Sequence, residues 1–100
     1  MTQPYCIGSD CWNGLSKLIE ELGELQQVCG KLIGSEGEHN HWSGDLREKF
    51  IEEIGDVHAA LDFFVQENFD IEEEYLIVVQ TERKIELFNE WNKNVQNAAS

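Results

Sequence analysis

The sequence predicts an all-α fold in which three long helices form an antiparallel bundle within one domain, residues 1–100. Three observations support this fold class. Apolar residues recur at helical spacing in three long stretches. Proline, which breaks helices, occurs only once, and glycines or capping sequences separate the stretches. Residues 1–11 and 97–100 lack the helical pattern, so we expect both ends to be loosely ordered.

The first helix is expected from Leu15 to Gly34. Its apolar residues recur three and four positions apart, which is typical of a helix with one buried face. Residues 34–44 then hold three glycines and mostly polar side chains, as loops do. The helix is therefore expected to end at Gly34. Its apolar residues are Leu15, Leu18, Ile19, Leu22, Leu25, Cys29, Leu32 and Ile33.

Capping sequences precede the second and third helices. Asp45 with Glu48 fits a capping box, and so does Asp70 with Glu73. The second helix is expected to end near Asn68, and the third is longer. Apolar residues of the second are Leu46, Phe50, Ile54, Val57, Leu61, Phe64 and Val65. Those of the third are Ile71, Tyr75, Val78, Val79, Ile85, Phe88, Trp91 and Val95.

Three helices of this length leave more apolar surface than one protomer can cover. Each would be about 33 Å long at a rise of about 1.5 Å per residue. We therefore expect association into a homodimer in which helices of two protomers complete a four-helix core. Gly23 and Gly55 favour such packing, because a glycine inside a helix costs about 1 kcal/mol relative to alanine. Their positions predict that backbones approach closely there.

Composition excludes several classes of partner. Seven basic and twenty acidic side chains give a net charge of −13, so few cations are present to replace the counterions of a nucleic acid. No stretch approaches the roughly 20 apolar residues of a membrane-spanning helix, and the first residues do not resemble a signal peptide. The odd number of cysteines, three, favours free thiols in a reducing compartment. We therefore expect a cytoplasmic protein that binds neither nucleic acid nor membrane.

The cysteines and histidines do not predict a zinc site. Cys6 and Cys11 with His39 and His41 carry suitable ligand atoms, but their spacings match no common zinc motif. Cys29 falls on the apolar face of the first expected helix, where it should pack as a small hydrophobic residue.

A short acidic motif occurs twice and is the strongest functional signal in the chain. Residues 20–24, Glu-Glu-Leu-Gly-Glu, return thirty-two positions later as residues 52–56, Glu-Glu-Ile-Gly-Asp. Acids three apart share one helix face, so each copy presents a pair of carboxylates. Two facing pairs would form a cage of four acids whose repulsion a divalent cation offsets. Oxygen ligands favour Mg²⁺, with Mn²⁺ as the alternative. The four acids are Glu21, Glu24, Glu53 and Asp56.

Acid pairs at this spacing also occur on ordinary solvent-exposed helix faces. Such faces usually supply a basic partner four residues along the helix. The residues four positions after Glu20, Glu21 and Glu24 are glutamate, leucine and valine. The second motif has Lys49 four positions before Glu53. The scarcity of local partners favours a metal site over a solvated face.

The paired motif resembles that of the MazG-like, all-α nucleoside triphosphate pyrophosphohydrolases. Their pattern is ExxE on one helix and ExxD on the next, each commonly preceded by another glutamate. The resemblance extends over about Trp12 to Trp91. It implies a homodimer or homotetramer whose four acids bind Mg²⁺. It also implies cleavage of a nucleoside triphosphate between its α and β phosphates, giving the monophosphate and pyrophosphate.

The resemblance also suggests which residues hold the triphosphate. Lys49 matches a basic position of the family that contacts phosphate. Lys84 and Asn89 are similar to a lysine and an asparagine of the family's third helix, although the arginine often found shortly afterwards is absent. These three residues are therefore the expected phosphate contacts.

Two further roles follow from the chemistry. An acid that is not a metal ligand, Glu20 or Glu52, would orient or deprotonate the attacking water. Trp12 or Trp42 would stack on the nucleobase, although a tryptophan near a helix start often serves instead as a core or interface anchor.

Two other functions compete with hydrolysis. A ferritin-like di-iron protein also uses acids from facing helices, but it needs Glu-x-x-His motifs, and here the fourth positions hold Glu24 and Asp56. A catalytically inactive, acidic helical interaction module of the same fold is the second alternative. The presence of all four acids argues against it.

Overall fold

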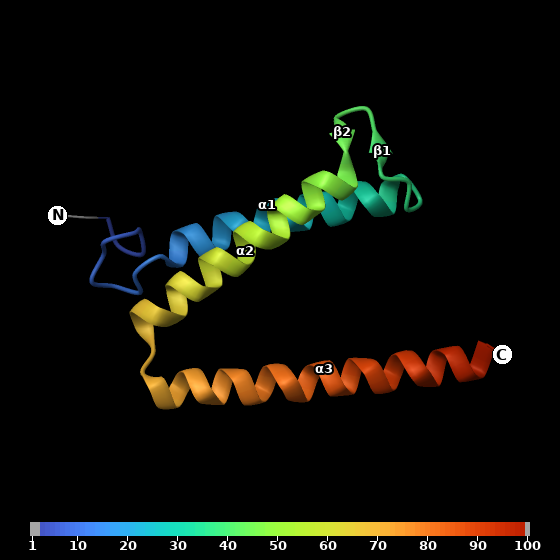
Figure 1. Cartoon of the computed structure of the whole chain (residues 1–100). Coiled ribbons are helices and arrows are strands. Elements are labelled where there is room, and N and C mark those ends of the chain that lie inside the picture. The colour runs from blue at the N-terminus through green and yellow to red at the C-terminus, as the bar shows by residue number, and fades with distance from the viewer. Residues whose placement is uncertain (1–2, 100) are drawn as a thin grey trace. The chain divides into compact units, whose positions relative to one another are not determined.

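Three long helices and one small hairpin make up the fold. The computed structural model describes residues 3–99 and orders them as α1 (Leu15–Gly34), β1 (Asn40–His41), β2 (Gly44–Asp45), α2 (Leu46–Asn68) and α3 (Ile71–Ala99) (Figure 1). The predicted all-α class is confirmed in this broad sense. The described chain divides into two compact units, residues 3–68 and residues 69–99.

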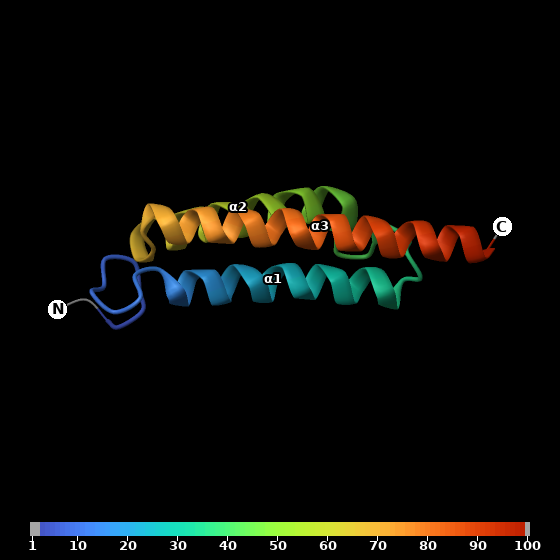
Figure 2. The ribbon, with the colours of Figure 1, turned by 90° about the horizontal axis from the view of Figure 1, so that it is seen from below.

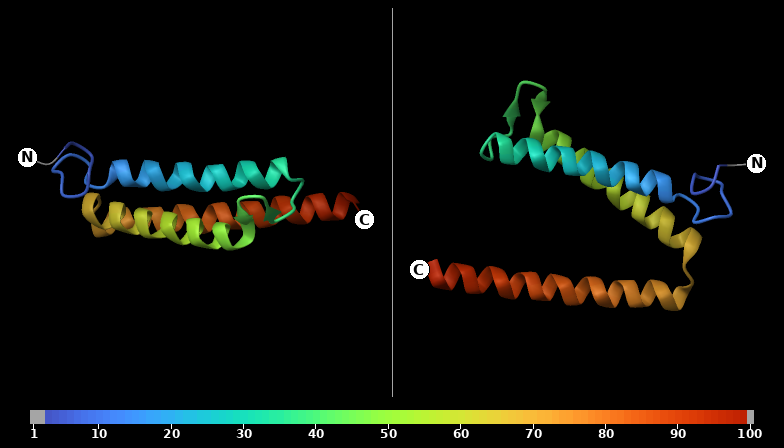
Figure 3. Two further views of the ribbon diagram at one scale, coloured as in Figure 1. Left: turned by 90° about the horizontal axis from the view of Figure 1, so that it is seen from above. Right: turned by 180° about the vertical axis from the view of Figure 1, so that it is seen from behind.

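In the first unit, α1 and α2 run antiparallel and lie side by side along their length (Figures 2 and 3). A small set of side chains is buried between them: Leu18 and Val28 from α1, and Leu46, Val57 and Ala60 from α2. This core agrees with the helical spacing of apolar residues in the sequence. It also fixes which helix faces meet, and therefore where the acids of the two motifs lie.

The segment before α1 is more ordered than its composition predicted. The Tyr5 N–H donates to the Cys11 carbonyl at 3.0 Å, and the Ser16 N–H donates to the Tyr5 carbonyl at 2.9 Å. The Asn68 side chain at the end of α2 donates to the Asn13 carbonyl at 2.9 Å. The expectation of a loose start over residues 1–11 therefore does not hold for residues 3–11, and residues 1 and 2 lie outside the described residues.

The segment between α1 and α2 contains a short hairpin in place of the simple loop that we expected. Asn40 pairs with Asp45 and His41 with Gly44 in an antiparallel ladder. Asp45 also caps α2, because its Oδ1 accepts from the Arg47 N–H at 2.9 Å. That hydrogen bond is the main reason why the pKa of Asp45 lies below its ordinary value, and a hydrogen bond to His39 lowers this pKa further. The hairpin thus ends where the predicted capping residue begins α2.

The mid-helix glycines lie in open space within the first unit. A Cβ atom built on Gly23 or Gly55 would meet no atom of the described residues within 4 Å. The packing of α1 against α2 therefore does not require glycine at either position. No close approach of backbones occurs at these glycines inside the first unit, and the predicted approach between protomers stays a prediction.

Gly14 is the glycine that the fold does require. It precedes α1 with a φ of +87°, and a Cβ atom there would lie 2.8 Å from the Phe63 ring. Gly14→Ala should therefore destabilise the protein by about 2 kcal/mol or more, through backbone strain and overpacking. Urea unfolding would measure the loss. Gly30→Ala is the matched control in open space on α1, and it should raise stability by up to about 1 kcal/mol. Equal effects of the two changes would contradict the packing at Gly14.

The second unit is the single helix α3. Its predicted capping box is present, because the Glu73 N–H donates to Asp70 Oδ1 at 2.8 Å and the Asp70 N–H donates to Glu73 Oε1 at 3.1 Å. The helix continues to Ala99, so residues 97–99 are helical where a frayed end was expected. No described residue of α3 is buried. Its exposed apolar side chains include Ile71, Tyr75, Leu76, Val78, Ile85, Phe88, Trp91 and Val95. No helix of residues 3–99 is both long enough and apolar enough to cross a membrane.

Candidate metal centre

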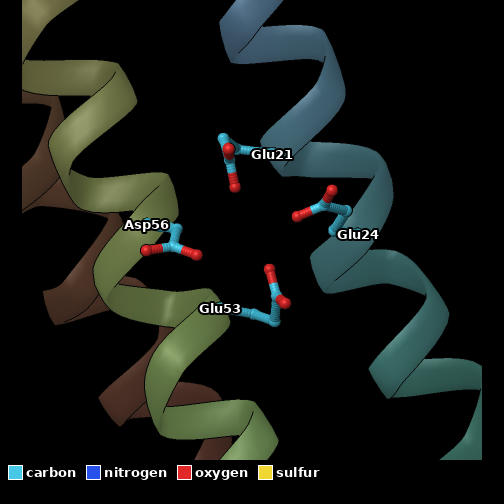
Figure 4. A group of neighbouring side chains, drawn as sticks. All are labelled: Glu21, Glu24, Glu53 and Asp56. Carbon is cyan, nitrogen blue, oxygen red and sulfur yellow. The ribbon is translucent and has the colours of Figure 1, made fainter.

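The four acids of the repeated motif converge between α1 and α2. Each offers one carboxylate oxygen, and these oxygens all lie within 4.8 Å of one another. Because the helices are antiparallel, Glu21 faces Asp56 and Glu24 faces Glu53 (Figure 4). The arrangement follows from two features of the sequence: the three-residue spacing of each acid pair and the apolar residues that turn both pairs toward the opposite helix. These four residues are called the acid cluster below.

Burial makes the acid cluster costly without a counter-ion. Glu53 is only 3% exposed, and the Glu21 side chain is 14% exposed. One buried oxygen of each, Oε2, has no hydrogen-bond partner among the described residues. A buried carboxylate oxygen without a partner loses its hydration and gains nothing in return. A cation held between the carboxylates would remove that cost.

The charges of the acid cluster act on each other. The pKa of Glu24 is raised above its ordinary value, first by the charge of Glu21, then by burial and then by Glu53. A raised carboxyl pKa means that the ionised form is disfavoured at this position. The acid cluster therefore has the strong negative potential that attracts either a proton or a metal ion.

Two lysines lie beside the acid cluster. Lys49 Nζ is 3.4 Å from Glu53 Oε1, and this contact with Glu53 is the main cause of a raised Lys49 pKa. Lys17 Nζ is 3.2 Å from Glu20 Oε2 and 3.9 Å from Glu21 Oε1, and its pKa is raised chiefly by the hydrogen bond to Glu20. Both side chains therefore stay charged, but they contact only part of the acidic group.

Sequence reasoning missed Lys17. It lies four residues before Glu21, as Lys49 lies four residues before Glu53. Lys17 precedes its acid, whereas a basic partner of the first motif was expected four residues after an acid. The same spacing, applied in both directions along the helix, identifies Lys17.

The donor set fits a hard divalent cation. Carboxylate oxygens are the ligands that Mg²⁺ and Mn²⁺ prefer. Around a single Mg²⁺, opposed oxygens would be about 4.2 Å apart and adjacent oxygens about 3 Å apart, so oxygens that all lie within 4.8 Å of one another need to close by at most about 2 Å. Rotation of the carboxylates supplies a movement of that size.

Comparisons with known protein families, curated proteins and solved structures give no match. The likeness to the pyrophosphohydrolases therefore rests on the paired acidic motif in the sequence.

Two hollows of different character flank the acid cluster within the first unit. The first is a cavity of about 440 Å³ at the N-terminal end of α1, and most of its lining is apolar. The second is a hollow of about 420 Å³ with a mostly charged and polar lining. The apolar cavity is lined by Ile7, Gly14, Lys17, Glu21, Asp56, Ala59, Ala60 and Phe63. The polar hollow is lined by Lys31, Ser43, Gly44, Asp45, Leu46, Glu48, Lys49 and Glu52.

The other candidate residues lie outside the acid cluster. Glu20 is held by Lys17, whereas Glu52 lines the polar hollow. Trp12 stacks on Phe64 with ring centroids 5.9 Å apart, and Trp42 is 91% exposed beside His41. Neither tryptophan lines the two hollows, so their use as a base platform stays a prediction.

Lys84 and Asn89 lie on α3, in the second unit. Lys84 Nζ is 5.9 Å from the centre of the Phe88 ring one turn further along the same helix. Their expected contacts with a triphosphate also stay predictions.

The zinc alternative finds no support in the described residues. Cys6 and Cys11 lie before the start of α1, whereas His39 and His41 lie beyond its end. Within residues 3–99, the acid cluster is the group whose side chains meet the distances of a metal site. All three cysteines are unpaired.

Proposed function

We propose that the protein is a Mg²⁺-dependent nucleoside triphosphate pyrophosphohydrolase, which converts an NTP or dNTP into the monophosphate and pyrophosphate. One observation supports this most directly. Four carboxylates from facing helices converge, and one of them, Glu53, is almost fully buried with an oxygen that lacks a partner. The same four acids are the metal ligands that the resemblance implies.

The reaction is a hydrolysis at the α-phosphorus. Water attacks this phosphorus, the bond to the bridging oxygen of the β-phosphate breaks, and pyrophosphate leaves with the electron pair. When bound, Mg²⁺ would offset the phosphate charge and lower the pKa of a coordinated water. The acid cluster would hold the ion, and Lys49 beside it would contact phosphate oxygens as a point charge.

Another carboxylate must accept the proton of the attacking water. Glu20 and Glu52 are the first residues of the two motifs, and their surroundings differ. Glu20 is paired with Lys17 at 3.2 Å, whereas within residues 3–99 no ion pair holds Glu52. Either of them would orient or deprotonate the water.

The proposed assembly is a homodimer or homotetramer in the cytoplasm. The apolar side chains of α3 are all at least partly exposed, and contiguous apolar surface of this kind marks an interface. A four-helix core formed by two protomers would bury it. Light scattering at micromolar concentration should therefore report at least a dimer. A stable monomer that releases pyrophosphate would contradict this assembly.

The proposed reaction is tested by a pyrophosphate-release assay over a panel of ribo- and deoxyribonucleoside triphosphates, including modified bases, with and without Mg²⁺. We expect monophosphate and pyrophosphate in equal amounts, and only with the metal. Release of orthophosphate would mean that a different bond is cleaved. No release from any substrate would favour the inactive interaction module.

A further inference from the structure

The two lysines beside the acid cluster lie at its opposite ends. Each precedes its acid by four residues, Lys17 before Glu21 on α1 and Lys49 before Glu53 on α2. Because α1 and α2 are antiparallel (Figures 1 and 2), the same step along the sequence leads in opposite directions in space. Lys17 therefore lies toward the N-terminal end of α1, and Lys49 lies toward the hairpin.

Each lysine also lines a different hollow. Lys17 belongs to the apolar cavity, where its neighbours include Ala59, Ala60 and Phe63. Lys49 belongs to the polar hollow, together with Lys31 and Ser43. Along the helix pair, the apolar cavity comes first, lined also by Glu21 and Asp56 of the acid cluster. The other two acids follow, and then Lys49 and the polar hollow.

This order distinguishes the two ends of a nucleoside triphosphate. An ionised terminal phosphate in the apolar cavity would lose its hydration without enough partners. A planar base in the apolar cavity would bury apolar surface against Phe63 and the two alanines. The polar hollow offers its two lysines and the Ser43 hydroxyl to phosphate oxygens, although three carboxylates, those of Asp45, Glu48 and Glu52, also line it. One of its acids, Asp45, is already engaged by the Arg47 N–H and by His39.

We propose that the substrate lies along the helix pair in one direction, with Lys17 at the phosphate that carries the nucleoside and Lys49 at the departing pyrophosphate. The base occupies the apolar cavity. Lys17 is then a positioning residue for the α-phosphate, held in place by its contact with Glu20 at 3.2 Å. This assignment rests on the proposed function and adds to it the direction of the substrate and the role of Lys17.

The proposed direction of the substrate along the helix pair predicts which product each lysine binds. Isothermal titration calorimetry in the presence of Mg²⁺ would compare a nucleoside monophosphate and inorganic pyrophosphate as separate ligands. Lys17→Gln should weaken monophosphate binding about tenfold, the scale of one lost charged hydrogen bond, and leave pyrophosphate binding within about twofold. Lys49→Gln should show the reverse pattern. Lys93→Gln on α3 removes the same charge elsewhere and should change neither.

A separate substitution tests whether the base occupies the apolar cavity. Ala59→Phe places a ring in it and should weaken monophosphate binding about tenfold while sparing pyrophosphate, since most of the affinity of a base comes from buried apolar area. Gln66→Phe adds the same bulk to an exposed position of α2 and serves as the control. Lys17→Arg keeps the charge and should retain most of the monophosphate affinity.

Some outcomes would overturn the proposal. If Lys17→Gln or Ala59→Phe weakens both products equally, or pyrophosphate alone, the assigned direction is wrong. The proposed function would then still stand, because the unchanged protein binds both products with Mg²⁺. If the unchanged protein binds neither product, the proposed function itself fails.

Discussion

Glu53→Gln is expected to abolish pyrophosphate release while leaving the helices intact. Glu53 is the most buried of the four acids, and its Oε2 lacks a partner in the described residues. The amide keeps the size of the side chain but removes the negative charge, and its NH₂ group cannot act as a ligand. Loss of a metal ligand should lower kcat/KM by at least two orders of magnitude, equivalent to about 2.7 kcal/mol or more of transition-state stabilisation.

A matched control separates the loss of metal from the loss of a charge. Asp62→Asn makes the same carboxylate-to-amide change at an exposed position of α2, and it should keep activity within about twofold. Circular dichroism should show equal helix content in both variants. If Glu53→Gln retains activity, the assignment of the acid cluster as the metal site is wrong. If it unfolds, Glu53→Asp offers a second variant that keeps the charge but shortens the ligand.

Mg²⁺ is expected to raise the melting temperature of the protein strongly. In the folded state the acid cluster holds buried carboxylates that repel one another, whereas the unfolded chain separates them. An ion at 100 times its dissociation constant stabilises the native state by about 2.7 kcal/mol. For a domain of this size that corresponds to a shift on the order of 10 °C. Differential scanning calorimetry would measure it.

The controls for this shift are ionic strength and Glu53→Gln. Monovalent salt at matched ionic strength screens repulsion without filling the site, so it should produce a much smaller shift. Glu53→Gln should lose most of the Mg²⁺ effect, and without metal it should be at least as stable as the unchanged protein because the repulsion is relieved. An equal shift with monovalent salt would rule out a preformed site.

The rise in melting temperature caused by Mg²⁺ should also depend on pH in a defined direction. The pKa of Glu24 is raised in the folded state by Glu21, burial and Glu53, so the folded protein binds this proton more tightly than the unfolded chain does. Without metal, the contribution of Glu24 to stability is therefore lost as pH rises from the ordinary carboxyl range through the raised pKa. Protons compete with Mg²⁺ for the same carboxylate, so the Mg²⁺-induced shift should shrink as pH falls through that raised pKa.

Local interactions explain why the helix limits could be predicted from sequence. Gly34 ends α1, and the reciprocal capping of Asp70 and Glu73 starts α3, as their residue types indicate. Both signals act within a few residues of the chain. The ordered start and the hairpin were missed because their hydrogen bonds depend on particular turn geometry and, for Asn68 with Asn13, on contacts between distant segments.

The sequence by itself determined that each motif places two acids on one face of a helix, since the helical repeat fixes which residues are neighbours. It did not determine which motif residues face each other, how deeply Glu53 is buried, or that an apolar cavity adjoins the acid cluster. Those features depend on the antiparallel packing of α1 on α2, which brings Glu24 opposite Glu53 and places Lys17 and Lys49 at opposite ends. Only tertiary structure decides them, because burial and the contacts of charges across two helices arise when distant segments pack together.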